Sequence, residues 1–377
     1  MVLYEITWYC YLCKKKDMDI IEHIGELLPI TPNFIISRLE RNELDQEVHI
    51  YLIVNKDTKP KNVTIQGYYD RSWEHLRLFQ YRCFIHCQLP IYKDKNTGEL
   101  HKATVSFSRD YSRFTLLYEK EVMRLMKIHH CFKTVAKQLD IYPQRVESIY
   151  HRYTTDYEIN EIKQTPVKVG YDETSTKKGH NYITTFYDLE INKIIGIYDG
   201  KSAECVKQFM KDHPYPEALK QISIDMSTAF ISGAKSCFAQ ADVTFDKWHV
   251  IKLLYKHLDS LENKKQFSVF NKYIQLLMND LQSFYQQKQY EQFTAQLTFI
   301  ADFAQEQFNE NPITKTIKNY YIGIANYAKS NINNGVLEGI NSKIQTIKRV
   351  AKGFRYIENF KKLIRFVFSD FNYQVIS

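Results

Sequence analysis

Apolar residues alternate with polar ones in the middle of the chain, and the pattern changes element by element from about residue 161. The stretches "PVKVGYDETS" and "NYITTFYDLEINKIIGIYDG" predict three strands, with a polar turn inside the second stretch. A helix is predicted for "SAECVKQFMKDH", a buried strand for "QISIDMS", a helix for "TAFISGAKSCF" and a strand for "ADVTFD". The predicted order is therefore strand, strand, strand, helix, strand, helix, strand.

This order predicts an α/β domain over residues 161–377, with a mixed sheet flanked by helices. It is the order of a ribonuclease H-like core. After Trp248 the apolar periodicity becomes that of long amphipathic helices and shows no strand pattern up to about residue 330. We interpret residues 250–330 as a helical insertion placed before the last helix of the core.

Three carboxylates fall at positions where this fold could bring them together. Asp172 lies on the first strand and Asp225 ends the fourth, and these strands are parallel neighbours in a ribonuclease H-like sheet. Glu338, in "NNGVLEGINSKIQTIKRVAKGFR", would come from the last core helix. Clustered acids raise one another's pKa unless cations neutralise them, and two Mg²⁺ or Mn²⁺ ions could then support phosphodiester chemistry. Each acid alone is explained more simply, as a helix cap, a turn residue or a helix-start acid, but the combination favours catalysis.

The helix that carries Glu338 has a predicted apolar face and a polar stripe beside it. Basic residues on that stripe would lie beside a phosphodiester substrate held at the carboxylates. The apolar face consists of Leu337, Ile340, Ile344 and Ile347, and the basic residues are Lys348, Arg349 and Lys352.

Asp246 and His249 in "FDKWHV" end the fifth strand. Their side chains could contact a metal, a scissile phosphate or a base, but the aspartate could equally cap the following helix. Their role stays open at this point.

Residues 106–160 have the apolar spacing of a helix-turn-helix domain. In "KTVAKQLDIYPQRVESIYHRY" two short amphipathic helices flank a tight turn at Asp140 and Ile141, and small Ala136 lies where the helices must approach closely. Aspartate tolerates the left-handed backbone conformation such a turn needs. An ordinary helical hairpin with a basic face is the alternative. The second helix would offer these side chains to a major groove: Gln144, Arg145, Ser148, His151 and Arg152.

Residues 1–105 contain two pairs of closely spaced cysteines, Cys10 with Cys13 and Cys83 with Cys87. Two such pairs can complete a tetrahedral zinc site, so this segment is predicted to be a small zinc-ribbon-like module. Strand-like runs such as "EVHIYLIV" and "NVTIQGYY" would then form an insertion in the ribbon. Four buried or free thiols are the alternative.

Composition narrows the function only slightly. The 377 residues have a formal net charge of +8, which favours polyanionic partners without requiring them. No stretch is long and apolar enough to span a membrane, and the N-terminus lacks a signal-peptide pattern, so a cytoplasmic protein is expected. An odd count of seven cysteines argues against a disulfide framework.

Three blocks of the sequence resemble bacterial insertion-sequence transposases of the Asp-Asp-Glu type, and in particular their ISL-type family. The blocks begin at "GYDETS", at "SIDMSTAF" and at "NNGVLEG". The resemblance implies that Asp172, Asp225 and Glu338 bind the catalytic metals. It also implies that His249, in a (Cys/Asp)-x-x-His pattern, acts near them.

The expected function is transposition. The N-terminal modules would bind terminal inverted repeats, and the core would use two Mg²⁺ or Mn²⁺ ions to cut DNA and join its 3′-hydroxyl to a target. Since two ends must be held together, a dimer or larger assembly on DNA is expected. Two alternatives are a DNA-binding regulator derived from a transposase and a ribonuclease H-like structure-specific nuclease.

Overall fold

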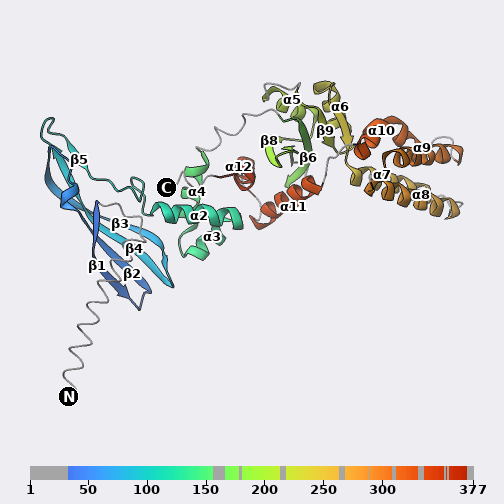
Figure 1. The fold of residues 1–377 in the computed structure, drawn as a ribbon. Helices are drawn as coiled ribbons and strands as arrows, with labels where there is room; N and C mark the ends of the chain where they lie inside the picture. The colour runs from blue at the N-terminus through green and yellow to red at the C-terminus, as the bar shows by residue number, and fades with distance from the viewer. Residues whose placement is uncertain are drawn as a thin grey trace, which may run out of the picture. The chain divides into compact units, whose positions relative to one another are not determined.

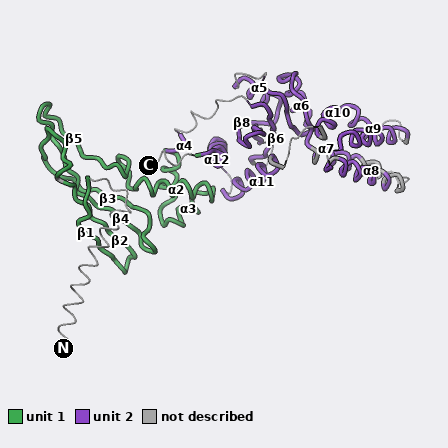
Figure 2. Tube along the Cα trace, in the orientation of Figure 1, with its two compact units in different colours: residues 1–152, 371–377 green, residues 153–370 purple. Residues whose placement is uncertain are grey.

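The computed structural model describes residues 33–155, 166–177, 181–212, 218–262, 268–287, 289–307, 311–329, 335–351, 354 and 356–371. The chain forms two compact units, one of residues 1–152 with 371–377 and one of residues 153–370 (Figure 2). Among the described helices, none is long and apolar enough to cross a membrane.

The first unit begins with a five-stranded mixed sheet (Figure 1). Its strands run in the order β1-β2-β4-β3, and β5 pairs with the far part of β4. β2 and β4 are parallel and the other pairs are antiparallel. The elements are β1 (Phe34–Asn42), β2 (Glu47–Val54), the short 3-10 helix η1 (Lys56–Thr58), β3 (Val63–Leu78), β4 (Tyr81–Asp94) and β5 (Leu100–Lys102).

One face of this sheet is its hydrophobic core, as strict alternation requires. The residues that point to this face are almost fully buried, and Phe107 covers them with its ring 5.2 Å from that of Trp73. The buried set is Val48, Ile50, Leu52, Trp73, Cys83, Ile85, Cys87 and Leu89.

The described part of the first unit also contains three helices: α2 (Leu116–His129), α3 (Phe132–Leu139) and α4 (Pro143–Thr155). The predicted helix-turn-helix corresponds to α3 and α4. Asp140 ends α3 in the left-handed conformation, with φ 59°, which confirms the predicted turn. Ala136 is buried, so the two helices can approach closely there.

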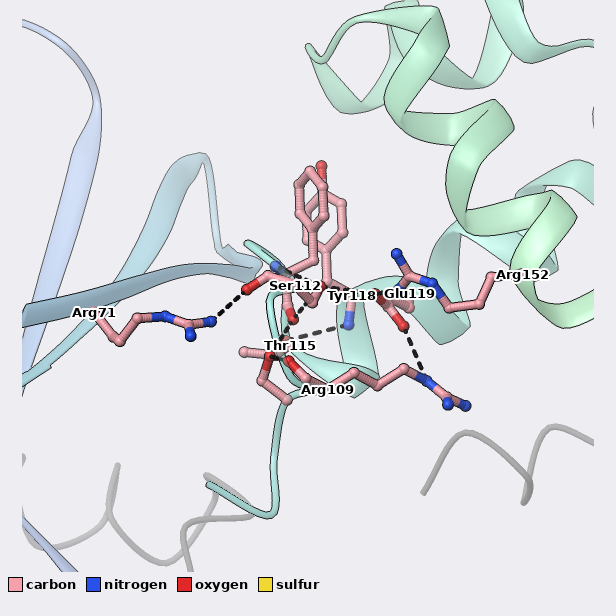
Figure 3. A network of polar contacts seen from close by, with 9 residues as sticks. Arg71, Arg109, Ser112, Thr115, Tyr118, Glu119 and Arg152 are labelled. Carbon is pink, nitrogen blue, oxygen red and sulfur yellow. Dashed lines mark hydrogen bonds and ion pairs between the residues drawn. The ribbon is translucent and has the colours of Figure 1, made fainter. Parts of the chain in front are cut away.

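Hydrogen bonds fasten the sheet to the helices (Figure 3). The backbone N–H of Glu74 on β3 donates to the carbonyl of Arg113, and the N–H of Thr115 donates back to Glu74 (2.8 and 3.0 Å). At the first turn of α2 the fully buried Glu119 accepts from Ser112 Oγ at 2.8 Å and from Arg152 Nη1 on α4 at 2.6 Å. These bonds join the sheet, α2 and α4.

The second unit has its own five-stranded sheet, in the order β10-β9-β6-β7-β8. β6, β7 and β8 are antiparallel, whereas β9 and β10 run parallel to β6. The order of elements along the chain is the predicted one. The elements are β6 (Lys168–Lys177), β7 (Asn181–Asp188), β8 (Lys193–Asp199), α5 (Ala203–Asp212), β9 (Gln221–Ile224), α6 (Thr228–Cys237) and β10 (Asp242–Phe245).

The described remainder of the second unit is helical, as predicted for residues 250–330. A further helix, α12, follows the helix that carries Glu338. Lys361 on α12 contacts Asp199 at the end of β8 (3.2 Å). The helices are α7 (Lys247–Glu262), α8 (Ser268–Gln286), α9 (Tyr290–Gln307), α10 (Pro312–Lys329), α11 (Gly335–Val350) and α12 (Ile357–Phe368).

Candidate active site

The register of the second sheet places three aspartates in one row. Gly170 on β6 lies opposite Ser223 on β9, so Asp172 and Asp225, each two residues further, come level with one another. Asp246 directly follows β10, and its N–H donates to the carbonyl of Ile224 on β9 (2.8 Å). The three carboxylates therefore lie at the same edge of neighbouring strands.

Helix α11 lies against β6 and brings Glu338 to the same edge. Its predicted apolar face is buried, from Leu337 to Ile347. A Cβ at Gly170 would lie 2.9 Å from Leu337, so the absence of a side chain there allows the helix to approach the sheet. One turn after Glu338, Asn341 donates a hydrogen bond from Nδ2 to Asp172 Oδ2.

These residues line a cleft of about 280 Å³. Asp172, Asp225 and Asp246 come from the sheet, and Glu338 is an exposed residue of α11. The lining also includes His249 and Lys252 of α7 and Asn341 of α11. The structure thus brings all three predicted acids and His249 to one cleft.

The surroundings of the cleft disfavour the ionised form of its aspartates. The pKa of Asp172 is raised to about 6, chiefly by burial and to a smaller extent by the neighbouring charge of Asp225. Burial also raises the pKa of Asp225, and Asp246 adds to that effect. Backbone N–H groups of Glu173 and Ser227 oppose the shifts by donating to these aspartates (2.7 and 2.9 Å).

Asp246 caps α7, which is one of the roles that the sequence left open, and it also lines the cleft. Its Oδ1 accepts from the backbone N–H of His249 at 3.3 Å, as a cap of α7, and lies 3.5 Å from the ring nitrogen Nδ1. The hydrogen bond to Asp246 raises the pKa of His249, with help from the charges of Asp172 and Asp225. A protonated His249 would partly neutralise the acidic row.

Asn341 and Tyr187 are the contributions that the sequence did not reveal. The Tyr187 hydroxyl donates to Asn341 Oδ1 at 3.2 Å, which fixes the amide so that its NH₂ group faces Asp172. Tyr187 is fully buried on β7. The sequence does place an Asn one helical turn after Glu338. Its hydrogen bond to Asp172, 169 positions away, could not be predicted from the spacing of residues.

The cleft offers hard oxygen donors of the kind that Mg²⁺ and Mn²⁺ prefer. Within the described ranges, no three His, Cys, Asp or Glu side chains are close enough together to hold an ion as they stand. Asp172 and Asp225 nevertheless fit a cation site chemically, because both are desolvated and each carboxylate destabilises the other. A cation in the cleft would relieve both effects.

The predicted zinc ribbon is wrong for the described part of the first unit. Cys83 and Cys87 lie on β4, not on a turn, and both point into the core. Four residues along a strand separate them by about 13 Å, whereas two thiolates on one zinc, each about 2.3 Å from it, must lie within about 4.6 Å of each other. Burial raises the pKa of each thiol to about 12, so both stay protonated. Cys10 and Cys13 lie outside the described residues.

The residues predicted to contact DNA differ in their exposure and in their partners. Gln144, Arg145 and Ser148 are exposed on α4, and His151 is half-buried, 3.6 Å from Glu147. Arg152 pairs with the buried Glu119, so we assign it to the structure of the domain and not to DNA contact.

The basic residues of α11 are divided in the same way. Lys348 Nζ donates to the carbonyl of Ser175 on β6 (2.6 Å), whereas Arg349 is exposed. Lys352 lies outside the described residues. Of the three basic residues expected along bound DNA on this helix, Arg349 is the one that is described and exposed.

Comparison with known proteins agrees with this organisation. A model of ISL3-type DDE transposases, described as "Transposase", matches residues 169–275 and 272–364, and one described as "Helix-turn-helix domain of transposase family ISL3" matches residues 103–154. The chain is also similar to the "Transposase for insertion sequence element IS1001" of Bordetella parapertussis, 26% identical over 252 residues. That match covers 52% of this chain and 60% of the relative. Because the first model spans more than half of the chain, the protein belongs to the ISL3 family of transposases.

Proposed function

We propose that this chain is the transposase of an insertion sequence, with a ribonuclease H-like catalytic core in its second unit. It binds the terminal inverted repeats of its element and carries out DNA cleavage and strand transfer. The observation that carries the proposal is the row formed by Asp172 and Asp225 on adjacent parallel strands, with Glu338 from α11 lining the same cleft. This arrangement explains why residues so distant in sequence share one site.

Asp172, Asp225 and Glu338 are the proposed ligands of Mg²⁺ or Mn²⁺. When bound, two such ions would polarise the scissile phosphodiester and favour an attacking oxygen. The chain's own part is to fix the ligands: Asn341 holds one oxygen of Asp172, and the N–H groups of Glu173 and Ser227 hold Asp172 and Asp225. The ligands are thus oriented before DNA arrives.

His249 and Lys252 supply positive charge to the same cleft. Both are on α7, whose first turn is fixed by Asp246. We assign to them the binding of non-bridging oxygens of the scissile phosphate, because cationic donors facing a phosphate make strong charge-assisted hydrogen bonds. In the first displacement water attacks the phosphorus at the element end and expels the 3′-oxygen, which leaves as a 3′-hydroxyl. In the second, that hydroxyl attacks a target phosphodiester and expels a 3′-oxygen of the target strand, again in line at phosphorus.

The helix-turn-helix supplies recognition of the element ends. In this proposal Gln144, Arg145 and Ser148 at the start of α4 enter a major groove and read base edges. Since transposition needs two ends held together, the active form is a dimer or larger assembly on DNA.

A joining assay tests the catalytic assignment. A precut element end is incubated with supercoiled target DNA and Mg²⁺, using wild type, Asp172→Ala, Asp225→Ala and Glu338→Ala. Joining should be lost in all three variants, and joining that survives any of them would remove that residue from the ligand set. Cleavage without any joining by the wild type would instead identify a structure-specific nuclease.

A further inference from the structure

The far part of the first sheet is a β-ribbon without a core. It consists of Val63–Tyr68 of β3, Ile91–Asp94 of β4 and all of β5, and we call it the arm (Figure 1). None of these residues is buried, although the adjoining Leu89 belongs to the core. A ribbon with no buried face is marginal in water unless a partner covers it.

Four lysines gather at the distal end of the arm. Val63 pairs with Asp94, and the N–H of Lys95 donates to the carbonyl of Asn62 (2.9 Å), so the two loops that end the arm are neighbours. The lysines are exposed, and none has a hydrogen-bond or ion-pair partner among the described residues. They are Lys59, Lys61, Lys93 and Lys95.

Three acids of the same region compensate part of this charge. Asp94 accepts from the N–H groups of Asn96 and Thr97 (2.7 and 2.9 Å), so it closes its own turn. Glu99 lies 3.8 Å from the His101 ring. Asp57 carries the remaining negative charge. The end of the arm therefore keeps a small net positive charge, and its four ammonium groups have no ion-pair partner among the described residues, which suits a polyanion.

Apolar side chains accompany the lysines. Ile65 lies opposite Tyr92 and Tyr68 opposite Pro90, and such cross-strand pairs share one face of a ribbon. Ile65 is 40% and Tyr68 59% exposed. Lys93 lies opposite Thr64 and so points to the other face of the ribbon from Tyr92. Ammonium groups and exposed apolar side chains around one ribbon suit a DNA backbone, where phosphates alternate with sugars.

The arm also has a defined position relative to α4. Glu74 on β3 is hydrogen-bonded to the segment that leads into α2, and Glu119 ties α2 to α4. Glu74 lines one cleft with Arg145 of α4, and from Glu74 back to Val63 eleven residues of strand span at most about 36 Å. One turn of the DNA double helix is about 34–36 Å.

We propose that the arm is a second DNA-binding element, which contacts phosphates of the same duplex about one helical turn from the groove that α4 reads. This inference rests on the proposed function, since it takes the DNA of the element end as the partner. Its chemistry is independent of base sequence, because ammonium groups recognise phosphate charge.

Salt-dependent binding tests the arm directly. The four lysines are changed together, Lys59→Gln, Lys61→Gln, Lys93→Gln and Lys95→Gln, and binding to a duplex carrying the DNA that flanks the coding region is titrated at several salt concentrations. Loss of four phosphate contacts should reduce the slope of log K against log salt by about 3 to 4. The matched variant with arginine at the same four positions should keep the wild-type slope.

The length of the duplex supplies the second readout. Removing about one helical turn, roughly 10 base pairs, from one end of the probe should lower wild-type affinity to that of the glutamine variant and leave the variant unchanged. Circular dichroism verifies that both variants fold.

Other outcomes reject the proposal. Equal slopes for wild type and the glutamine variant on the long duplex would overturn the arm contact alone. A wild type that shows no preference for element-end DNA would overturn the proposed function and the arm's partner with it. If Tyr68→Ser changes the oligomeric state of the DNA-free protein, the arm pairs with a second copy and the proposal is wrong.

Discussion

Cys83 and Cys87 in the first sheet and Asp172 and Asp225 in the second all lie on or directly after β-strands. The cysteines share one strand and point into a core, about 13 Å apart. The aspartates come from adjacent parallel strands, level with one another at the edge of a cleft. Residues that are close in sequence are thus kept apart, and residues 53 positions apart are brought together.

The two pairs differ because the cysteines follow one another along a single strand, whereas the aspartates lie side by side on neighbouring strands. Along a strand, each residue adds about 3.3 Å, so a short sequence spacing becomes a long distance. Across neighbouring strands, the separation is about 4.8 Å whatever the sequence distance. A short Cys-x-x-x-Cys spacing therefore indicates a metal site when it falls on a turn. On a strand it indicates two side chains of the hydrophobic core.

The largest effect should come from the acidic row. Asp172→Asn keeps the shape of the side chain but removes its charge, and we expect the rate of strand transfer to fall on the order of 10³-fold or more. Asp242→Asn, an exposed position at the start of β10 and outside the cleft, is the matched control. A variant that joins DNA within about tenfold of the wild-type rate would contradict the assignment.

In the metal-free protein, one buried residue in each sheet should change the free energy of unfolding in opposite directions as the pH falls. Burial lowers the pKa of His75, on β3, to about 4 from 6.5, so the unfolded chain takes up the proton first and stability falls as the pH drops from about 6.5 towards 4. Burial raises the pKa of Asp172 from 3.8 to about 6, so the folded chain takes up the proton first and stability rises as the pH drops from about 6 towards 3.8. Each effect has a limit of about 3 kcal/mol.

Urea unfolding of the His75→Gln and Asp172→Asn variants between pH 7 and pH 4.5 measures these contributions. His75→Gln should lose less stability on acidification than wild type. Asp172→Asn should be more stable than wild type at pH 7 and gain less on acidification. If either variant shows the wild-type pH dependence, the residue does not titrate as its burial implies.

Asn341→Ala tests the fixation of Asp172 and should have a smaller effect. Partners that orient a metal ligand typically contribute 10- to 100-fold, so we expect about that loss in strand transfer. The affinity for Mn²⁺, measured by calorimetry without DNA, should fall as well. Ser342→Ala, at the next and exposed position of α11, should change neither quantity. Unchanged Mn²⁺ affinity in Asn341→Ala would show that the amide does not position the ligand.

The smallest effect should come from the cysteines of the first sheet. Cys83→Ala removes a small buried side chain, and we expect the free energy of unfolding to fall by about 1 kcal/mol. The zinc content of the purified protein, measured by mass spectrometry of the metal, should be the same before and after the change. A loss of bound zinc in Cys83→Ala would restore the cysteine to a metal site.

The sequence predicted the second sheet well because each strand carries a local signal, either alternation or a short apolar run. The order of elements from residue 168 to 245 and the buried face from Leu337 to Ile347 are as expected. The turn at Asp140 was predictable from local chemistry alone.

Contacts between distant residues could not be predicted in this way. Arg152 has the sequence position of a DNA-contacting residue, but Glu119, 33 positions earlier, captures it. The parallel pairing of β2 with β4 could likewise not be predicted, because alternation shows which face of a strand is buried but not which strand pairs with it. Spacing gives the face on which a side chain lies, and the folded partner decides what it contacts.

The bonds around Glu74 and Glu119 also define the smallest fragment that should fold and bind DNA by itself. A fragment beginning near residue 103 would keep α2, α3 and α4 but would uncover Phe107, whose ring packs against Trp73, and leave the backbone groups of Arg113 and Thr115 without β3. A fragment of residues 33–155 keeps every one of these contacts. The sheet therefore supports the segment that leads into α2, and α4 should be expressed together with the sheet to stay folded.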